Sequence, residues 1–333
     1  MLLLPLWAAF CIAAAASPGR AVYGVATAPA APIASPVVSS ETVALGKLLF
    51  FDPRLSRNGL ISCATCHDPA KGWADGRAVA VGIGGQKGRR KTPSLLNVGR
   101  REKLFWDGRS SSLEDQVHFP VGDAKEMGSS LEQAAKHIGA VDGYRPYFKS
   151  AFGDDGVTPA RIASAIAAFE RTLVSFNSPY DRYLDGDKTA LSPVALRGLN
   201  QSFTKGRCFM CHDLTKRGPV DPEFLDIGLS TPTAAGDMGR YEVTKKDDDV
   251  RAFRVPDLRN LKYTAPYMHD GRFRTLREVI DFYNRGSDEV DPMKIPWIAP
   301  LGLTEQEKLD LLEFLDALNG DPLAMAPPED IPK

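Results

Sequence analysis

Two copies of one five-residue pattern constrain this chain more than any other feature. In each copy, two cysteines are separated by two residues and followed at once by a histidine. Thiols at that spacing lie on one turn and add across the two vinyl groups of a haem, while the adjacent histidine reaches the iron. The patterns therefore predict two covalently bound c-type haems, each with a proximal histidine. They are Cys63-Ala-Thr-Cys66-His67 and Cys208-Phe-Met-Cys211-His212.

The same cysteines permit two other interpretations, a zinc site and disulfides. A zinc site would require the two pairs to converge from distant parts of the chain. Local disulfides would leave the repeated histidine without a role. The chain has five cysteines, and the one outside the patterns is Cys11. We therefore favour haem over both alternatives.

The first residues of the chain predict export. Residues 2–16 form an apolar run, shorter than the about 20 residues of a membrane span, and small residues follow it. We expect a signal peptide over 1–21, a flexible Ala- and Pro-rich leader over 22–40, no membrane span after cleavage and a periplasmic location. An uncleaved anchor is the alternative. The net charge of -1 gives no electrostatic reason to expect a nucleic-acid partner.

The rest of the chain predicts a mostly α fold with long loops. Residues 160–176 carry apolar side chains at helical spacing. Gly- and Pro-rich stretches at 81–97 and 213–240 suit loops wrapped around large cofactors. Each cysteine pattern opens a region of comparable size, so we expect one haem-binding domain over 41–188 and a second over 189–325.

The positions of the histidines predict that the first haem has an open face. Besides the two proximal residues, the chain has only His118, His137 and His269. No histidine lies between His67 and His118, so the first haem has no nearby second ligand, and an open haem can bind peroxide. We expect His137 on a helix surface, and His118 either in the distal pocket or in solvent.

The second haem has two possible axial ligands on the side opposite His212. Apolar residues at i, i+3, i+4 and i+7 within residues 274–286 put the Tyr283 phenol on the buried face of a helix. Tyr283 is then either a packed core residue or an iron ligand. Met268 is the rival, because thioether ligation is common in c-type cytochromes.

Longer motifs resemble those of the bacterial di-haem cytochrome c peroxidases, and more closely the MauG branch of that family. The resemblance runs from about residue 41 to 320. It implies two helical, cytochrome c-like domains with one haem each, the first reacting with hydrogen peroxide and the second transferring electrons. The motifs are LGKLLFFDPRLSRNGLISCATCHDPAKGW (45–73), KTPSLLNV (91–98), FWDGR (105–109) and RVPDLRNLKYTAPYMHDGRF (254–273).

The resemblance also implies roles for individual residues. His67 is the proximal ligand of the peroxide-reactive haem, Trp106 relays charge between the haems, and Glu126 is the distal acid–base group. Pro120 matches a distal-pocket proline of the MauG branch. Tyr283 matches the axial ligand of the second haem, where other peroxidases of the family have Met and MauG has Tyr. The lack of a displaceable distal histidine also implies MauG-like behaviour.

Two positions depart from the family pattern. Lys91 replaces an asparagine that binds calcium, and an ammonium there would oppose a divalent cation, so calcium is doubtful. Gly206 stands where MauG has a tryptophan used to oxidise its protein substrate.

Three functions follow as hypotheses. The favoured one is MauG-like use of peroxide to form high-valent haem and oxidise side chains of a partner, as in tryptophan tryptophylquinone maturation of a methylamine dehydrogenase precursor. The alternative is a cytochrome c peroxidase that removes hydrogen peroxide with electrons from a small cytochrome or cupredoxin. The non-enzymatic alternative is a di-haem electron carrier with both irons closed.

Overall fold

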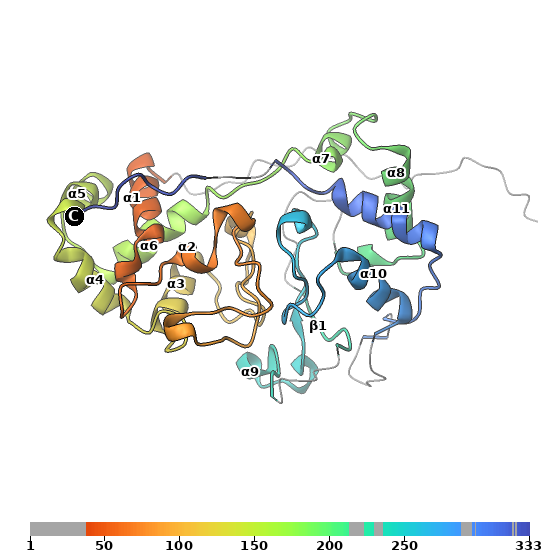
Figure 1. Ribbon diagram of the computed structural model, residues 1–333, viewed down its shortest axis with the longest axis horizontal. Coiled ribbons are helices and arrows are strands. Elements are labelled where there is room, and N and C mark those ends of the chain that lie inside the picture. The colour runs from red at the N-terminus through yellow and green to blue at the C-terminus, as the bar shows by residue number, and fades with distance from the viewer. Residues whose placement is uncertain are drawn as a thin grey trace, which may run out of the picture.

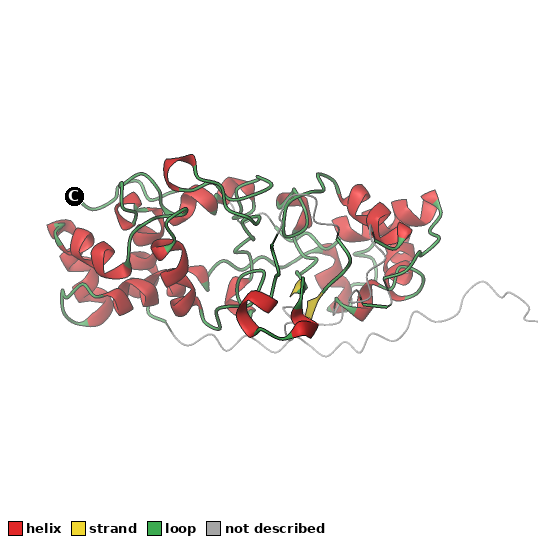
Figure 2. Cartoon of the chain, turned by 90° about the horizontal axis from the view of Figure 1, so that it is seen from below, coloured by secondary structure: helices red, strands yellow, loops and turns green. Residues whose placement is uncertain are grey.

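The computed structural model describes residues 38–212, 223–229, 236–287, 295–296, 298–321, 323 and 325–333. The expected signal peptide and nearly all of the leader lie outside them. Helices gather at the two ends of the molecule and irregular loops fill the middle, as Figure 1 and Figure 2 show. The fold is mostly α, as predicted. The α-helices are α1 (Ser40–Phe51), α2 (Cys63–Cys66), α3 (Leu113–Gly122), α4 (Leu131–Gly139), α5 (Arg145–Phe152), α6 (Pro159–Glu170), α7 (Pro179–Leu184), α8 (Pro193–Phe203), α9 (Tyr241–Thr244), α10 (Leu276–Arg285) and α11 (Glu305–Asp316).

The first half of the chain is organised by the crossing of α1 and α6. Gly46 of α1 lies where the helices touch, and a Cβ at this position would lie 1.8 Å from the main-chain oxygen of Ala165. Only glycine permits so close an approach. Leu45, Leu49 and Phe169 are buried beside the crossing. The short helix α2, which carries the first cysteine pattern, packs against α1.

The second half of the chain contains a similar close helix crossing, formed by α8 and α11. Gly198 of α8 faces α11, and a Cβ there would lie 1.9 Å from the main-chain oxygen of Asp310. Tyr180, Leu199 and Phe314 are buried around this crossing. Each half therefore supports its cysteine pattern with a glycine-mediated helix crossing, although the sequences around the two patterns show no clear repeat.

The end of the chain returns to the first half, where the C-terminus lies beside α5 (Figure 1). The indole Nε1 of Trp73 donates a hydrogen bond of 3.0 Å to the carbonyl of Leu323, and the main-chain N–H of Gly143 donates one of 3.1 Å to Lys333. Leu323, Met325 and Ile331 pack against the first hydrophobic core. The last residues thus bridge the two halves.

The helix predicted over 160–176 is shorter in the structure. It begins at Pro159 and ends at Glu170. The residues after it bond to distant segments instead: the N–H of Asn97 donates to Leu173 O (2.7 Å), and the N–H of Ser175 donates to Oδ1 of Asn97 (2.9 Å). These tertiary hydrogen bonds replace those of another helical turn.

Two further features complete the middle of the molecule. The strands β1 (Phe224–Leu225) and β2 (Phe253–Arg254) pair antiparallel, with Phe224 opposite Arg254. Among the residues that the structure describes, no helix combines the length and the apolar character needed to cross a membrane.

Candidate functional site

The first cysteine pattern forms a single helical turn. Ser62 and Thr65 make a capping box at its start, and the N–H of His67 donates to Cys63 O (2.9 Å). Nδ1 of His67 lies 3.0 Å from the carbonyl of Trp73. Because a carbonyl only accepts hydrogen bonds, Nδ1 carries the proton and Nε2 is left as a metal ligand.

The second pattern reproduces this geometry on a 3₁₀ turn over Cys208–Met210. The N–H of His212 donates to Cys208 O (2.9 Å), and its Nδ1 lies 3.0 Å from the carbonyl of Pro256. Burial lowers the pKa of His212 to about 4 and also lowers that of His67. Both rings are therefore neutral at physiological pH, as iron ligation requires.

The arrangement does not suit the alternative uses of the cysteines. All four thiols of the two patterns are free, so no disulfide joins them. Across the described part of the chain, no group of three or more His, Cys, Asp or Glu side chains is arranged to hold a metal ion. The two patterns therefore do not combine into a zinc site.

A cavity of about 250 Å³ opens beside the second pattern. Cys208, Cys211 and His212 line it on one side, and the apolar face of α10 lines it on another. Thr275 caps α10 with a capping box, which sets the register that turns Tyr283 into the cavity. Met268 lines the same cavity, so the structure brings both possible axial ligands to this site. Burial raises the pKa of the Tyr283 phenol.

The charges in this cavity suit a dianionic haem. Arg101 and Arg254 line it, and their guanidinium groups make hydrogen bonds to main-chain carbonyls, of 3.3 Å to Ser94 and of 3.2 Å to Phe105 and to Val255. Neither has an ion pair with a carboxylate among the described residues. Burial lowers the pKa of both and brings that of Arg254 to about 9. Buried cations without counter-ions call for an anionic ligand, and haem propionates would satisfy them.

Glu126 lies close to the first pattern. Burial raises its pKa, with Asp123 adding to this effect and Arg109 opposing it. Burial also raises the pKa of Cys66 to about 11, and the carboxylates of Asp75 and Glu126 contribute. The main-chain carbonyl of Glu126 accepts a hydrogen bond of 2.8 Å from the N–H of Ile83.

A close backbone approach holds Glu126 in this place. A Cβ on Gly82 would lie 2.6 Å from the Cα of Glu126. Only glycine at position 82 therefore lets this loop come so close to the backbone of Glu126. Pro120 lies inside α3 and accepts a hydrogen bond of 3.1 Å from the N–H of Met127. Pro120 and Glu126 are thus linked through consecutive segments beside the first site.

The three remaining histidines occupy different environments. His118 on α3 and His137 on α4 are exposed, and Nδ1 of His137 lies 3.3 Å from the carbonyl of Arg54. The surface position predicted for His137 is confirmed, and His118 points to solvent. His269 is buried and lines the second cavity, a placement that the sequence analysis missed. Its ring stacks on Phe253, with centroids 3.6 Å apart.

Trp106 is held by hydrogen bonds at both ends and lies at the second cavity. Its indole Nε1 donates to Lys91 O (2.9 Å), and its main-chain carbonyl accepts from the N–H of Arg254 (2.8 Å). The ring meets His269 edge to face, with centroids 6.4 Å apart, and lines the second cavity. These contacts hold the indole in one orientation.

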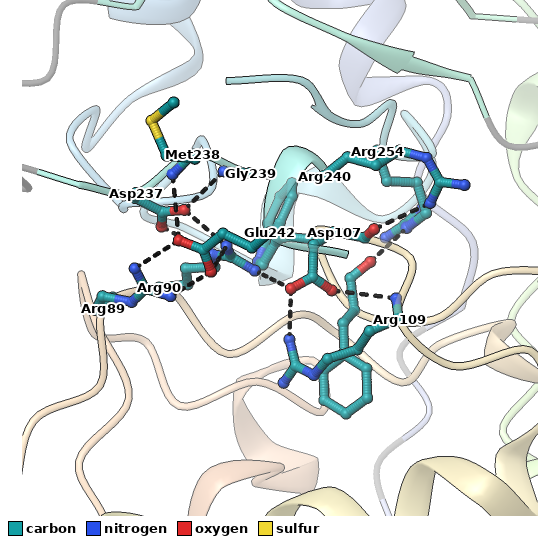
Figure 3. A network of polar contacts seen from close by, with 12 residues as sticks. Arg89, Arg90, Asp107, Arg109, Asp237, Met238, Gly239, Arg240, Glu242 and Arg254 are labelled. Carbon is teal, nitrogen blue, oxygen red and sulfur yellow. Dashed lines mark hydrogen bonds and ion pairs between the residues drawn. The ribbon is translucent and has the colours of Figure 1, made fainter. Parts of the chain in front are cut away.

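A network of ion pairs locks the surrounding loops together (Figure 3). Arg90 bonds Asp107 (2.6 Å) on one side and Asp237 (2.7 Å) on the other. Arg89 pairs with Glu242 at 2.6 Å. Because Asp107 directly follows Trp106 and Asp237 comes from the second half, the network fixes the tryptophan segment against the second cavity.

Comparisons with known proteins agree with this geometry. A family model described as di-haem cytochrome c peroxidase matches residues 40–189. The chain is 40% identical to a protein of Methylorubrum extorquens named methylamine utilization protein MauG, covering 90% of this chain and 83% of that one. It is 39% identical to cytochrome c551 peroxidase of Nitrosomonas europaea, covering 74% of each. A crystal structure of a MauG-like protein associated with microbial copper homeostasis superposes with a TM-score of 0.80 at 35% identity, covering 90% of this chain and 95% of the other.

Proposed function

Because the chain belongs to the di-haem cytochrome c peroxidase family, and is thus a haem peroxidase with two covalently bound c-type haems, we propose that it oxidises side chains of a partner protein. Cys63, Cys66 and His67 would hold the peroxide-reactive haem, and Cys208, Cys211 and His212 the electron-transfer haem. The observation that carries this proposal is that Tyr283 and His212 line one cavity. A His/Tyr haem favours the oxidised metal and so suits storage of oxidising equivalents.

A haem held by Cys63, Cys66 and His67 would supply the iron chemistry that reduces hydrogen peroxide. Glu126 acts there as the proton carrier. Its carboxylate would take a proton from one oxygen of hydrogen peroxide and return it to the other, which leaves as water. Partial burial raises the pKa of this carboxyl, which favours proton return.

Trp106 would relay charge between the two sites. It lines the second cavity, and the contacts described above hold its indole still. A fixed aromatic ring needs no reorganisation before an electron passes through it. Pro120 would shape the distal side of the first site and exclude a further ligand.

The route from the second haem to the partner differs from that of MauG itself. At Gly206 a Cβ would lie 2.8 Å from the main-chain oxygen of Gln201. A tryptophan at this position would therefore require the backbone to shift. Electrons from a methylamine dehydrogenase precursor would therefore reach the haem by another path.

A second function is favoured by Met268. Its thioether lines the same cavity as Tyr283, and a His/Met haem would have a higher reduction potential. Such a haem suits a cytochrome c peroxidase that accepts electrons from a small cytochrome or cupredoxin.

In either function we propose that the mature protein acts in the periplasm after signal cleavage.

One experiment separates these two functions. The purified di-haem protein receives hydrogen peroxide together with either reduced small cytochrome c or a methylamine dehydrogenase precursor. We expect oxidation of precursor side chains, detected as a mass change and new quinone absorption, with slow cytochrome oxidation. Rapid catalytic oxidation of the cytochrome with an unmodified precursor would contradict side-chain oxidation and favour peroxide removal.

A further inference from the structure

We propose that the ammonium group of Lys91 is a fixed positive charge in the wall between the two haem sites and raises the reduction potential of both haems. The inference deepens the proposed function and rests on its two haem sites, although not on the identity of the partner. The wall is the segment 91–97, and Lys91 is its first residue.

The wall faces both sites. On one side, the N–H of Leu95 donates to Trp73 O (3.2 Å), the same carbonyl that orients Nδ1 of His67. On the other side, residues of the wall line the second cavity together with His212. These wall residues are Lys91, Pro93, Ser94, Leu96 and Asn97. A charge placed in this segment therefore lies near both irons.

Lys91 is buried and has no counter-ion. Its exposed fraction is 6%, and its ammonium makes neither an ion pair nor a hydrogen bond within the described residues. The nearest acidic influence is Asp75, which is itself engaged by the hydroxyl of Thr92 (3.1 Å). Burial lowers the pKa of Lys91 to about 8, opposed by Asp75, so the ammonium is still the main form at pH 7.

The adjacent residue, Arg90, shows how an ion-paired cation differs from Lys91. Arg90 is paired with both Asp107 and Asp237, so its field is cancelled locally (Figure 3). No described carboxylate forms an ion pair with Lys91, and its positive charge acts at His67 against the opposite charge of Asp75. A positive charge near a haem disfavours loss of an electron from its iron.

Two hydrogen bonds fix the main chain of Lys91, from which this side chain extends. Its N–H donates to His269 O (2.7 Å) and its carbonyl accepts from Trp106 Nε1 (2.9 Å). The wall therefore cannot move without breaking contacts to two aromatic residues of the second cavity. In a water-poor interior such a charge acts over a longer range than on the surface.

The test is spectroelectrochemical titration of both haems at pH 6.5 in the intact di-haem protein. Lys91→Met and Lys91→Gln remove the charge, and Lys91→Arg retains it. Lys87→Met is the matched control, because Lys87 lies on the preceding loop and is exposed. We expect both potentials to shift downward in the two neutral variants, and to stay near those of the wild type in Lys91→Arg and Lys87→Met.

The result that would overturn the proposal is a neutral variant, with two haems and unchanged axial ligand signals, in which either potential equals that of the wild type. Two neutral variants are compared. If one of them incorporates haem poorly, the potentials of the other decide the test. Reaction with peroxide is measured separately. An inert wild-type protein would contradict the proposed function, whereas unshifted potentials in a reactive protein would contradict only the role of Lys91.

Discussion

The indole Nε1 of Trp106 donates a hydrogen bond of 2.9 Å to the main-chain carbonyl of Lys91. This bond joins the residue expected to relay charge to the wall that separates the haem sites. It also explains why the tryptophan has one orientation, because its carbonyl is held at the same time by the N–H of Arg254 (2.8 Å).

Trp106→Phe tests this relay. Phenylalanine fills most of the same space but lacks the N–H donor and is much harder to oxidise. We expect both haems to remain bound with their resting spectra, a loss of stability of about 1 kcal/mol from the missing hydrogen bond, and no response of the second haem when peroxide is added. Stopped-flow absorption of each haem provides the measurement. A second haem that still responds at the wild-type rate would remove Trp106 from the pathway.

Glu126→Gln tests the proton carrier. Glutamine keeps the shape of the side chain but cannot exchange a proton, so we expect the reaction with peroxide to slow by about 10²–10⁴-fold with an unchanged resting spectrum. The wild-type rate should fall as pH drops below the raised pKa of Glu126, because the base form is then lost. The variant should lack this pH dependence. Glu132→Gln on the exposed face of α4 is the control, and an equal loss in the control would refute a specific role.

Tyr283→Met tests the axial ligand of the second haem. Replacing the phenolate oxygen by a thioether should raise the reduction potential of this haem and introduce a methionine–iron absorption signature. Met268→Leu should leave the wild-type spectrum unchanged. The assignment is wrong if the wild type already shows the methionine signature and Met268→Leu removes it.

Glu170 makes stability depend on pH. Burial raises the pKa of its carboxyl to about 8, and its Oε2 has no hydrogen-bond partner in the described residues. The native protein therefore keeps a proton that the unfolded chain releases above pH 4.5, and the free energy of unfolding should fall between that pH and about 8. The slope is at most about 1.4 kcal/mol per pH unit.

Chemical unfolding of Glu170→Gln checks this expectation. The variant should match the wild type near pH 5 and exceed its stability near pH 8, because glutamine has no proton to lose. Glu102→Gln, at an exposed position, should follow the wild type at both values. Parallel pH dependence in the wild type and Glu170→Gln would show that another group is responsible.

Local patterns in the sequence predicted the parts of the site that depend on local structure. The spacing of each cysteine pattern indicated a single turn, and the register of α10 placed Tyr283 on the buried face that lines the cavity. In both cases the geometry follows from residues a few positions apart.

The remaining features depend on contacts between distant segments, which periodicity does not encode. The end of α6 at Glu170 follows from hydrogen bonds between Asn97 and the residues after the helix. The burial of His269 and Arg254 in the second cavity also depends on distant segments. The residues next to them in the sequence do not indicate that either side chain is buried. The crossing at Gly46 becomes apparent only when Ala165 lies against it.

The central claim is that the two irons differ, one open and one closed by a protein side chain. Electron paramagnetic resonance of the resting ferric protein, before and after one equivalent of hydrogen peroxide, tests it most directly. We predict one high-spin and one low-spin signal of equal weight, with the high-spin signal changing within seconds of peroxide addition. A single haem per chain, or two low-spin haems that do not respond to peroxide, would contradict the account.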